Sequence, residues 1–154
     1  MDIEQNKALV SRGYQLFQSG NIDDLLQLFA DDIEWTGMEV ENVPFSRDYH
    51  GRQDVGQFFA ELNQAQEAQR FEPQDMIAEG DKVVVRGYAQ WNVRSTGKTY
   101  SYPWVHCFTL RDGKVARFEQ YFDTAATRDA FMPAGMGAMA GAAATTGAGT
   151  VPIQ

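Results

Sequence analysis

A histidine on an aromatic strand is the residue of this sequence best suited to chemistry. Residues 100–110 predict a β-strand, and because side chains alternate across a strand, the even positions share one face. That face carries Tyr100, Tyr102, Trp104, His106, Phe108 and Leu110. Rings with one or two polar groups among them are typical of small-molecule pockets. An imidazole, with an unperturbed pKa of about 6.5, can act there as acid, base or hydrogen-bond donor. His106 is therefore a candidate catalytic residue; the alternative is a histidine satisfied within the core.

Asp123 is the second candidate acid or base, at the end of the last predicted strand. Tyr121 lies two positions earlier and would share its face, which suits a carboxylate and a phenol at the rim of a pocket. The alternative is structural, because Asp123-Thr124-Ala125-Ala126 is also a good N-cap for a short terminal helix. The sequence leaves both roles open.

Two other kinds of site are not supported by the residue spacing. Cys107 is adjacent to His106, and adjacent strand residues point to opposite faces, which disfavours a Cys/His nucleophilic pair. His50 is the other imidazole of the chain, and no familiar metal-ligand spacing is present. We therefore expect no metal and no other cofactor.

The composition predicts a single cytoplasmic domain. A chain of 154 residues suits one domain. Its net charge of -8 argues against nucleic acid and anionic membrane surfaces, since both select patches rich in Lys and Arg. With one cysteine, no intramolecular disulfide can form, and a reducing cytoplasm is expected. We expect no signal peptide, because the first residues are acidic, and no membrane span, because the uncharged residues 130–154 include two prolines.

Apolar residues at helical spacing predict three helices in the first half of the chain. The first spans residues 3–18 and stops at a Ser-Gly-Asn sequence. The second is short, covers residues 22–29 and closes at residues 30–32, before an extended segment. The third opens after Gly51, and its apolar residues make one buried stripe.

Four strand-like segments follow, at residues 71–79, 82–93, 98–110 and 114–123. The residues between them, Gly80-Asp81, Ser95-Thr96-Gly97 and Asp112-Gly113, are typical of hairpin turns. Consecutive hairpins predict an antiparallel sheet, and helices that precede strands predict an α+β layer. The domain would cover residues 1–132. Residues 133–154 are rich in Ala and Gly and carry no charge, so we expect a disordered tail.

Three groups of local strings carry a family resemblance. They are Ser19-Gly20-Asn21-Ile22-Asp23 with Leu28-Phe29-Ala30-Asp31-Asp32, Tyr49-His50-Gly51-Arg52 with Val55 and Phe58-Phe59, and Phe108 through Asp112-Gly113-Lys114-Val115 to Tyr121-Phe122-Asp123. Over residues 3–131 the chain resembles the nuclear transport factor two-like superfamily, in particular its SnoaL-like, ketosteroid isomerase-related branch. The resemblance implies a cone-shaped α+β barrel, with three N-terminal helices packed on a strongly curved antiparallel sheet. It also implies a homodimer, paired through the outer face of the sheet.

The resemblance places the functional groups of the ketosteroid isomerases on this sequence. Their general base follows the string that matches residues 30–32, and that place is held by Gly37. Their phenolic oxyanion donor falls at Gly13, one step from Tyr14. Their second donor, a protonated carboxylic acid, matches His106, which is also the position of the acid/base aspartate in SnoaL-like cyclases. The resemblance therefore implies an imidazole at a family acid/base position, without the isomerase base.

These considerations predict a protein that binds a small apolar molecule in a cavity. The resemblance implies an isomerase, cyclase or dehydratase that uses acid–base chemistry on an apolar carbonyl or polyketide-like substrate, with no cofactor. The expected catalytic residues are His106 and Asp123. The expected substrate-binding residues are Trp35, Tyr49, Phe58, Trp91, Tyr102, Trp104 and Tyr121. Two alternatives are a non-catalytic binding protein and an assembly domain of the same fold.

Overall fold

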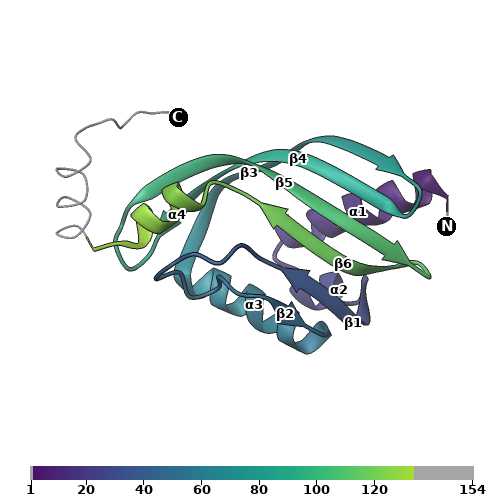
Figure 1. The fold of residues 1–154 in the computed structure, drawn as a ribbon, viewed down its shortest axis with the longest axis horizontal. Coiled ribbons are helices and arrows are strands. Elements are labelled where there is room, and N and C mark those ends of the chain that lie inside the picture. The colour runs from purple at the N-terminus through teal and green to yellow at the C-terminus, as the bar shows by residue number, and fades with distance from the viewer. Residues whose placement is uncertain (1, 134–154) are drawn as a thin grey trace.

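The computed structural model describes residues 2–133, and six strands in this range form one curved sheet (Figure 1). The strands are β1 (Phe29–Thr36), β2 (Tyr49–His50), β3 (Gln66–Glu79), β4 (Lys82–Val93), β5 (Thr99–Arg111) and β6 (Lys114–Tyr121). Their order across the sheet is β2-β1-β6-β5-β4-β3. Neighbouring strands are antiparallel, except that β1 and β6 run parallel. The predicted α+β class is confirmed, and the sheet is unclosed because β2 and β3 form two edges.

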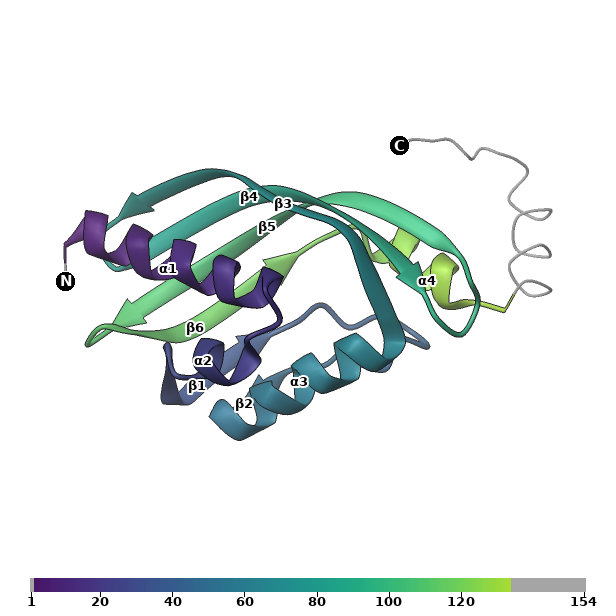
Figure 2. The ribbon, with the colours of Figure 1, turned by 180° about the vertical axis from the view of Figure 1, so that it is seen from behind.

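Four helices accompany the sheet: α1 (Ile3–Gln18), α2 (Ile22–Leu26), α3 (Arg52–Ala65) and α4 (Thr124–Phe131). Figure 2 shows α1 lying across the concave side of the sheet, with α2 and α3 beside it. A capping box starts α1: the Asp2 carboxylate accepts from the Gln5 backbone N–H, and the Gln5 side chain accepts from the Asp2 N–H. The buried side of α1 includes Val10 and Tyr14, which therefore face the core. The predicted tail at residues 133–154 lies outside the described residues apart from Pro133.

Two element boundaries differ from those predicted. Phe29 begins β1 instead of ending a helix, because the backbone there pairs with β6 at Val115. The segment at residues 30–32, expected to close the second helix, is consequently part of β1. At the other end of the sheet, β3 starts at Gln66, directly after α3, and pairs with β4 from that residue onward. The exposed polar residues at the start of this edge strand conceal the alternation by which strands are identified.

The hairpin predictions are confirmed by the register of the central strands. Glu79 pairs with Lys82 and Arg111 with Lys114, so each of these two turns has two residues in its loop. Asp112 has a φ of 52°, a left-handed conformation that a type I′ turn requires. Burial alternates along β5, with the even positions buried, as the sequence predicts. The core lies between this concave face and the helices.

Candidate functional site

A cavity of about 100 Å³ lies between the concave face of the sheet and the helices. Its walls are mainly aromatic and aliphatic side chains contributed by α1, α3 and the strands. The polar lining residues are Tyr14, Gln66, Trp91, Tyr102, His106 and Gln120, together with two further indoles. No Asp, Glu, Lys or Arg of residues 2–133 lines the cavity. A ligand there meets hydrogen-bonding groups but no charged side chain.

Tyr14 and His106 form the polar centre of the cavity. The Tyr14 hydroxyl lies 2.7 Å from His106 Nδ1. The two rings are within 9° of parallel, with their centroids 5.9 Å apart. Burial lowers the pKa of His106 to about 3 and raises that of Tyr14, because each charged form would lose its hydration. At neutral pH both groups are therefore uncharged.

His106 lines the cavity with one ring nitrogen, Nδ1, engaged by Tyr14. In the described part of the chain, the fully buried side-chain nitrogens and oxygens without a partner are Asn6 Oδ1, Trp35 Nε1 and Trp104 Nε1. The residue His106 is buried, with 8% of its surface accessible, and its hydrogen bond to Tyr14 uses Nδ1. Because His106 lines the cavity and Nδ1 is engaged, Nε2 is the ring nitrogen left for a ligand.

Trp104 holds the imidazole in place from the neighbouring position on β5. Its indole stacks on His106 with ring centroids 4.0 Å apart and on Phe71 at 5.0 Å. Trp104 pairs in register with Gly87 of β4, and a Cβ at residue 87 would lie 2.6 Å from indole Cε2. The indole can lie across β4 because residue 87 has no side chain.

A second polar group fixes the other end of the β5 face. The Trp91 indole N–H donates to Tyr102 Oη at 3.0 Å, and both residues line the cavity. Tyr100 Oη donates to Gln66 Oε1 at 2.6 Å. These hydrogen bonds satisfy the buried polar atoms and fix the positions of the rings. The polar groups at this end are therefore less available than His106 to form a hydrogen bond with a ligand.

The structure separates the predicted site residues into two groups. Those that line the cavity are Trp35, Phe58, Trp91, Tyr102, Trp104 and His106. Tyr121 does not: it is 47% exposed, and its hydroxyl donates to Glu119 at 3.3 Å. Tyr121 is the last residue of β6, and its exposed side chain points away from the concave face. The prediction that Tyr121 faces the cavity is therefore wrong. Asp123 does not line the cavity either.

Asp123 takes the structural role that was the alternative in the sequence. Its carboxylate accepts from the Ala126 N–H at 2.9 Å, which caps α4, and the residue is exposed. The prediction of a catalytic Asp123 is corrected accordingly, because the chain leaves the sheet after Tyr121 and turns the carboxylate toward the helix N-terminus.

Asp123→Ala is expected to destabilise the protein by about 1 kcal/mol, because the first turn of α4 loses its cap. Asp123→Asn is the matched variant: it removes the charge but keeps an oxygen that can cap, and it should stay within a few tenths of a kcal/mol of the wild type. Thermal unfolding of the three proteins measures this. Equal losses in both variants would contradict the capping role.

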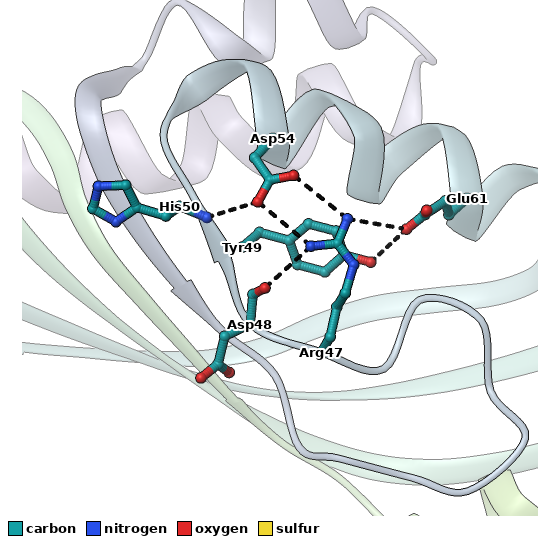
Figure 3. Close-up of polar contacts among 6 residues, drawn as sticks. All are labelled: Arg47, Asp48, Tyr49, His50, Asp54 and Glu61. Atoms are coloured by element: carbon teal, nitrogen blue, oxygen red, sulfur yellow. Dashed lines mark hydrogen bonds and ion pairs between the residues drawn. The ribbon is translucent and has the colours of Figure 1, made fainter.

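Tyr49 belongs to a polar cluster outside the cavity, shown in Figure 3. Its hydroxyl donates to Glu61 Oε1 at 2.6 Å, and the Arg47 guanidinium lies 3.7 Å from its ring centroid. Arg47 also pairs with Asp54 at 3.4 Å, and Asp54 accepts from the His50 N–H at 2.9 Å. The cluster attaches the loop before β2 to α3. Tyr49 is buried but serves this attachment, so its predicted contact with substrate is corrected.

Tyr14 is the site residue that sequence reasoning did not assign. Tyr14 falls within the helix predicted over residues 3–18, whose apolar residues form a stripe at helical spacing, and the resemblance placed an oxyanion donor one step away at Gly13. The stripe could not show which strand residue the hydroxyl would meet. At the place of the isomerase base, a Cβ on Gly37 would lie 3.0 Å from the Arg47 carbonyl oxygen, so even an alanine requires the loop to shift.

Within residues 2–133, no group of three or more His, Cys, Asp or Glu side chains is placed to hold a metal ion. No helix in that range is both long and apolar enough to span a bilayer.

The family model that describes the SnoaL-like domain matches residues 10–118 of this sequence. No curated protein matches the chain. An NTF2-like protein from Burkholderia xenovorans is 28% identical, with a TM-score of 0.77, over 86% of this chain and 99% of that one. TerC, co-crystallised with polyporic acid, is also 28% identical, with a TM-score of 0.73, over 82% of this chain and 98% of that one. A proposed polyketide cyclase from Xanthomonas campestris is 19% identical over 84% and 98% of the chains, with a TM-score of 0.69, and so shows the fold alone.

Proposed function

Since the chain belongs to the SnoaL-like domain family, we propose that it binds a small, neutral, apolar carbonyl compound and catalyses proton transfer next to the carbonyl. The reaction class is that of an isomerase, cyclase or dehydratase. The observation that carries the proposal is the 2.7 Å hydrogen bond between Tyr14 and His106 in a cavity without charged lining residues among residues 2–133.

The polarity of the cavity supports a neutral ligand. An ion transferred into an apolar cavity loses its hydration and needs a charged partner to offset that loss. The Tyr14–His106 pair provides none, since burial keeps both groups neutral. A carbonyl group is neutral and accepts hydrogen bonds, so it matches a mainly apolar cavity whose polar lining groups are uncharged.

His106 can serve such a ligand in either of two tautomers. When the Tyr14 hydroxyl donates to Nδ1, Nε2 carries the proton and donates to the ligand oxygen. When Nδ1 donates to the Tyr14 oxygen, Nε2 holds a free lone pair and can take a proton from the carbon next to the ligand carbonyl, which leaves an imidazolium beside an enolate. Both tautomers of the resting ring are uncharged, which agrees with its lowered pKa, and return of the proton to the enolate restores the neutral ring. Tyr14 is therefore a positioning residue that selects the state of the imidazole.

One comparison supports an organic ligand. TerC, which is 28% identical to this chain, was co-crystallised with polyporic acid. The cavity of about 100 Å³ is smaller than the engineered cavity of about 150 Å³ that holds benzene. The group that enters it is therefore small, such as a short ketone segment.

A non-catalytic binding protein is the second candidate function. The observation that favours it is the absence of a carboxylate among the cavity-lining residues of the described chain. With Gly37 at the place of the isomerase base, His106 would have to move every proton alone. Ligand binding without turnover needs no base.

Exchange of the α-protons of 2-butanone in D₂O, followed by NMR, separates the two functions. We expect the wild-type protein to accelerate exchange about 10²-fold, the lower end of general acid–base catalysis, because one neutral imidazole acts without a carboxylate. Tyr14→Phe should lower the accelerated rate about tenfold by removing one hydrogen bond to the imidazole, and His106→Ala should lower it at least as much.

Tyr100→Phe is the matched control for the exchange experiment. It also deletes a buried, hydrogen-bonded hydroxyl, but Tyr100 does not line the cavity, so the exchange rate should stay within about threefold of the wild type. If 2-butanone binds by calorimetry and exchange is not accelerated, the protein binds without catalysis. A rate unaffected by His106→Ala would remove His106 from the mechanism.

A further inference from the structure

A second hollow adjoins the cavity on its outer side. It measures about 750 Å³ and is lined by residues from the end of α1, the start of α2, α3 and the first half of β3. We call this hollow the outer groove. It shares six lining residues with the cavity: Phe17, Phe59, Leu62, Gln66, Phe71 and Trp91. The two spaces are therefore on opposite sides of one wall of side chains.

Phe71 is the part of that wall nearest the polar centre. Its ring centroid lies 6.3 Å from that of His106 and 5.0 Å from those of Trp104 and Phe17. The side chain is only half-buried, although it touches the cavity. For one ligand to occupy both spaces, this ring has to turn aside, and a side-chain rotation of that kind is fast compared with backbone rearrangements.

The sizes of the two spaces argue for one ligand that occupies both. The cavity holds only a few heavy atoms beside His106, whereas small-molecule sites typically measure about 300–1,000 Å³. The groove supplies the missing volume next to the cavity wall. Its inner side is the mainly apolar wall that it shares with the cavity, while Gln18, Asn63 and Gln69 also line it with polar groups.

The charges of the groove select against an ionic tail. Arg70 is the charged residue that lines it within residues 2–133. The guanidinium is already paired with both oxygens of Glu72, at 2.9 Å each, and lies 4.6 Å from the Tyr88 ring centroid. An anionic group would compete with Glu72, so an uncharged chain fits this groove best.

Resting on the proposed function, we infer that the ligand is an elongated neutral ketone whose carbonyl lies at His106 and whose apolar chain extends past Phe71 into the outer groove. The groove is then the part of the site that selects chain length. Each methylene placed against its apolar wall loses water contact and adds to affinity.

Isothermal calorimetry with 2-butanone and 2-decanone tests this inference. For the wild type, partial burial of each added methylene should tighten binding about twofold, so 2-decanone should bind at least about thirtyfold more tightly than 2-butanone. Ala60→Trp and Ala68→Trp fill the groove from its two sides, at exposed positions that do not line the cavity. In either variant the dissociation constant of 2-butanone divided by that of 2-decanone should be at least about tenfold smaller than in the wild type.

Gln57→Trp is the matched control, since it adds the same indole at an exposed position of α3 outside the groove, and it should keep the wild-type ratio. An unchanged ratio in both groove variants, or an equal loss in Gln57→Trp, overturns the inference. If 2-decanone binds and responds to the groove variants while neither ketone undergoes exchange, catalysis fails and the groove inference stands. If neither ketone binds, both proposals fall.

Discussion

Acidification from pH 6.5 to pH 4.5 is expected to cost the wild-type protein about 2–3 kcal/mol of unfolding free energy more than it costs the His106→Asn variant. The pKa of His106 is about 3 in the folded protein, because burial disfavours the imidazolium, against about 6.5 in an unfolded chain. Between these two values the unfolded chain binds a proton that the folded protein does not. Stability therefore falls as the pH falls through this window, by up to about 1.4 kcal/mol per pH unit. Asparagine at residue 106 cannot titrate, so this part of the loss disappears.

Denaturant unfolding at pH 7.0, 5.5 and 4.5 measures the effect as a difference between the two proteins. The variant will be less stable at pH 7 because it leaves space beside Trp104, but the comparison concerns the slope with pH and not the absolute value. Carboxylates whose pKa is lowered, among them Asp54 and Glu72, also contribute less to stability as the pH falls. This loss is the same in both proteins, so it cancels in the difference between them. Parallel curves for wild type and His106→Asn would show that the imidazole titrates freely.

Gly87→Ala is expected to destabilise the protein by about 3 kcal/mol, at the upper end of the range for overpacked cores. A Cβ at this position would lie 2.5 Å from the Glu72 carbonyl oxygen and closer still to Cζ2 of Trp104. The obstacles are backbone and a stacked indole, so neither can move aside without disturbing β3 or the rings around His106. For a protein of this length the melting temperature should fall by about 6–12 °C.

Gly13→Ala is the matched control for this substitution. A Cβ there would meet Leu25 Cδ1 at 3.5 Å, an ordinary contact, and residue 13 lies inside α1. Alanine in place of glycine within a helix stabilises by about 0.5–1 kcal/mol, so the same chemical change should raise the melting temperature. Thermal unfolding of both variants separates the local geometry from the general effect of the exchange. A Gly87→Ala protein as stable as the wild type would mean that Trp104 does not lie across β4.

The elements that position the site follow from local patterns in the sequence. Alternation along residues 100–110 placed His106 on a buried aromatic face, and the structure has that face buried. The Gly-Asp and Asp-Gly turns set the β3–β4 and β5–β6 hairpins, because few residues adopt the left-handed conformations that such turns require. The boundary of β1 was predicted less well, since its start depends on pairing with β6 and not on its own residues.

The partner of the imidazole was decided only by the tertiary structure. Tyr14 and His106 are 92 positions apart, and no periodicity relates a residue on one helix to a residue on a distant strand. The same reason explains Asp123, Tyr49 and Tyr121: each was judged by its own strand face or neighbours, while its contact depends on where the chain turns next. The sequence by itself determined the kind of fold and the aromatic surroundings of His106, because alternation and turn chemistry act over a few residues. The hydrogen bond that sets the state of His106, and the groove beside it, depend on how α1, α3 and the sheet pack together.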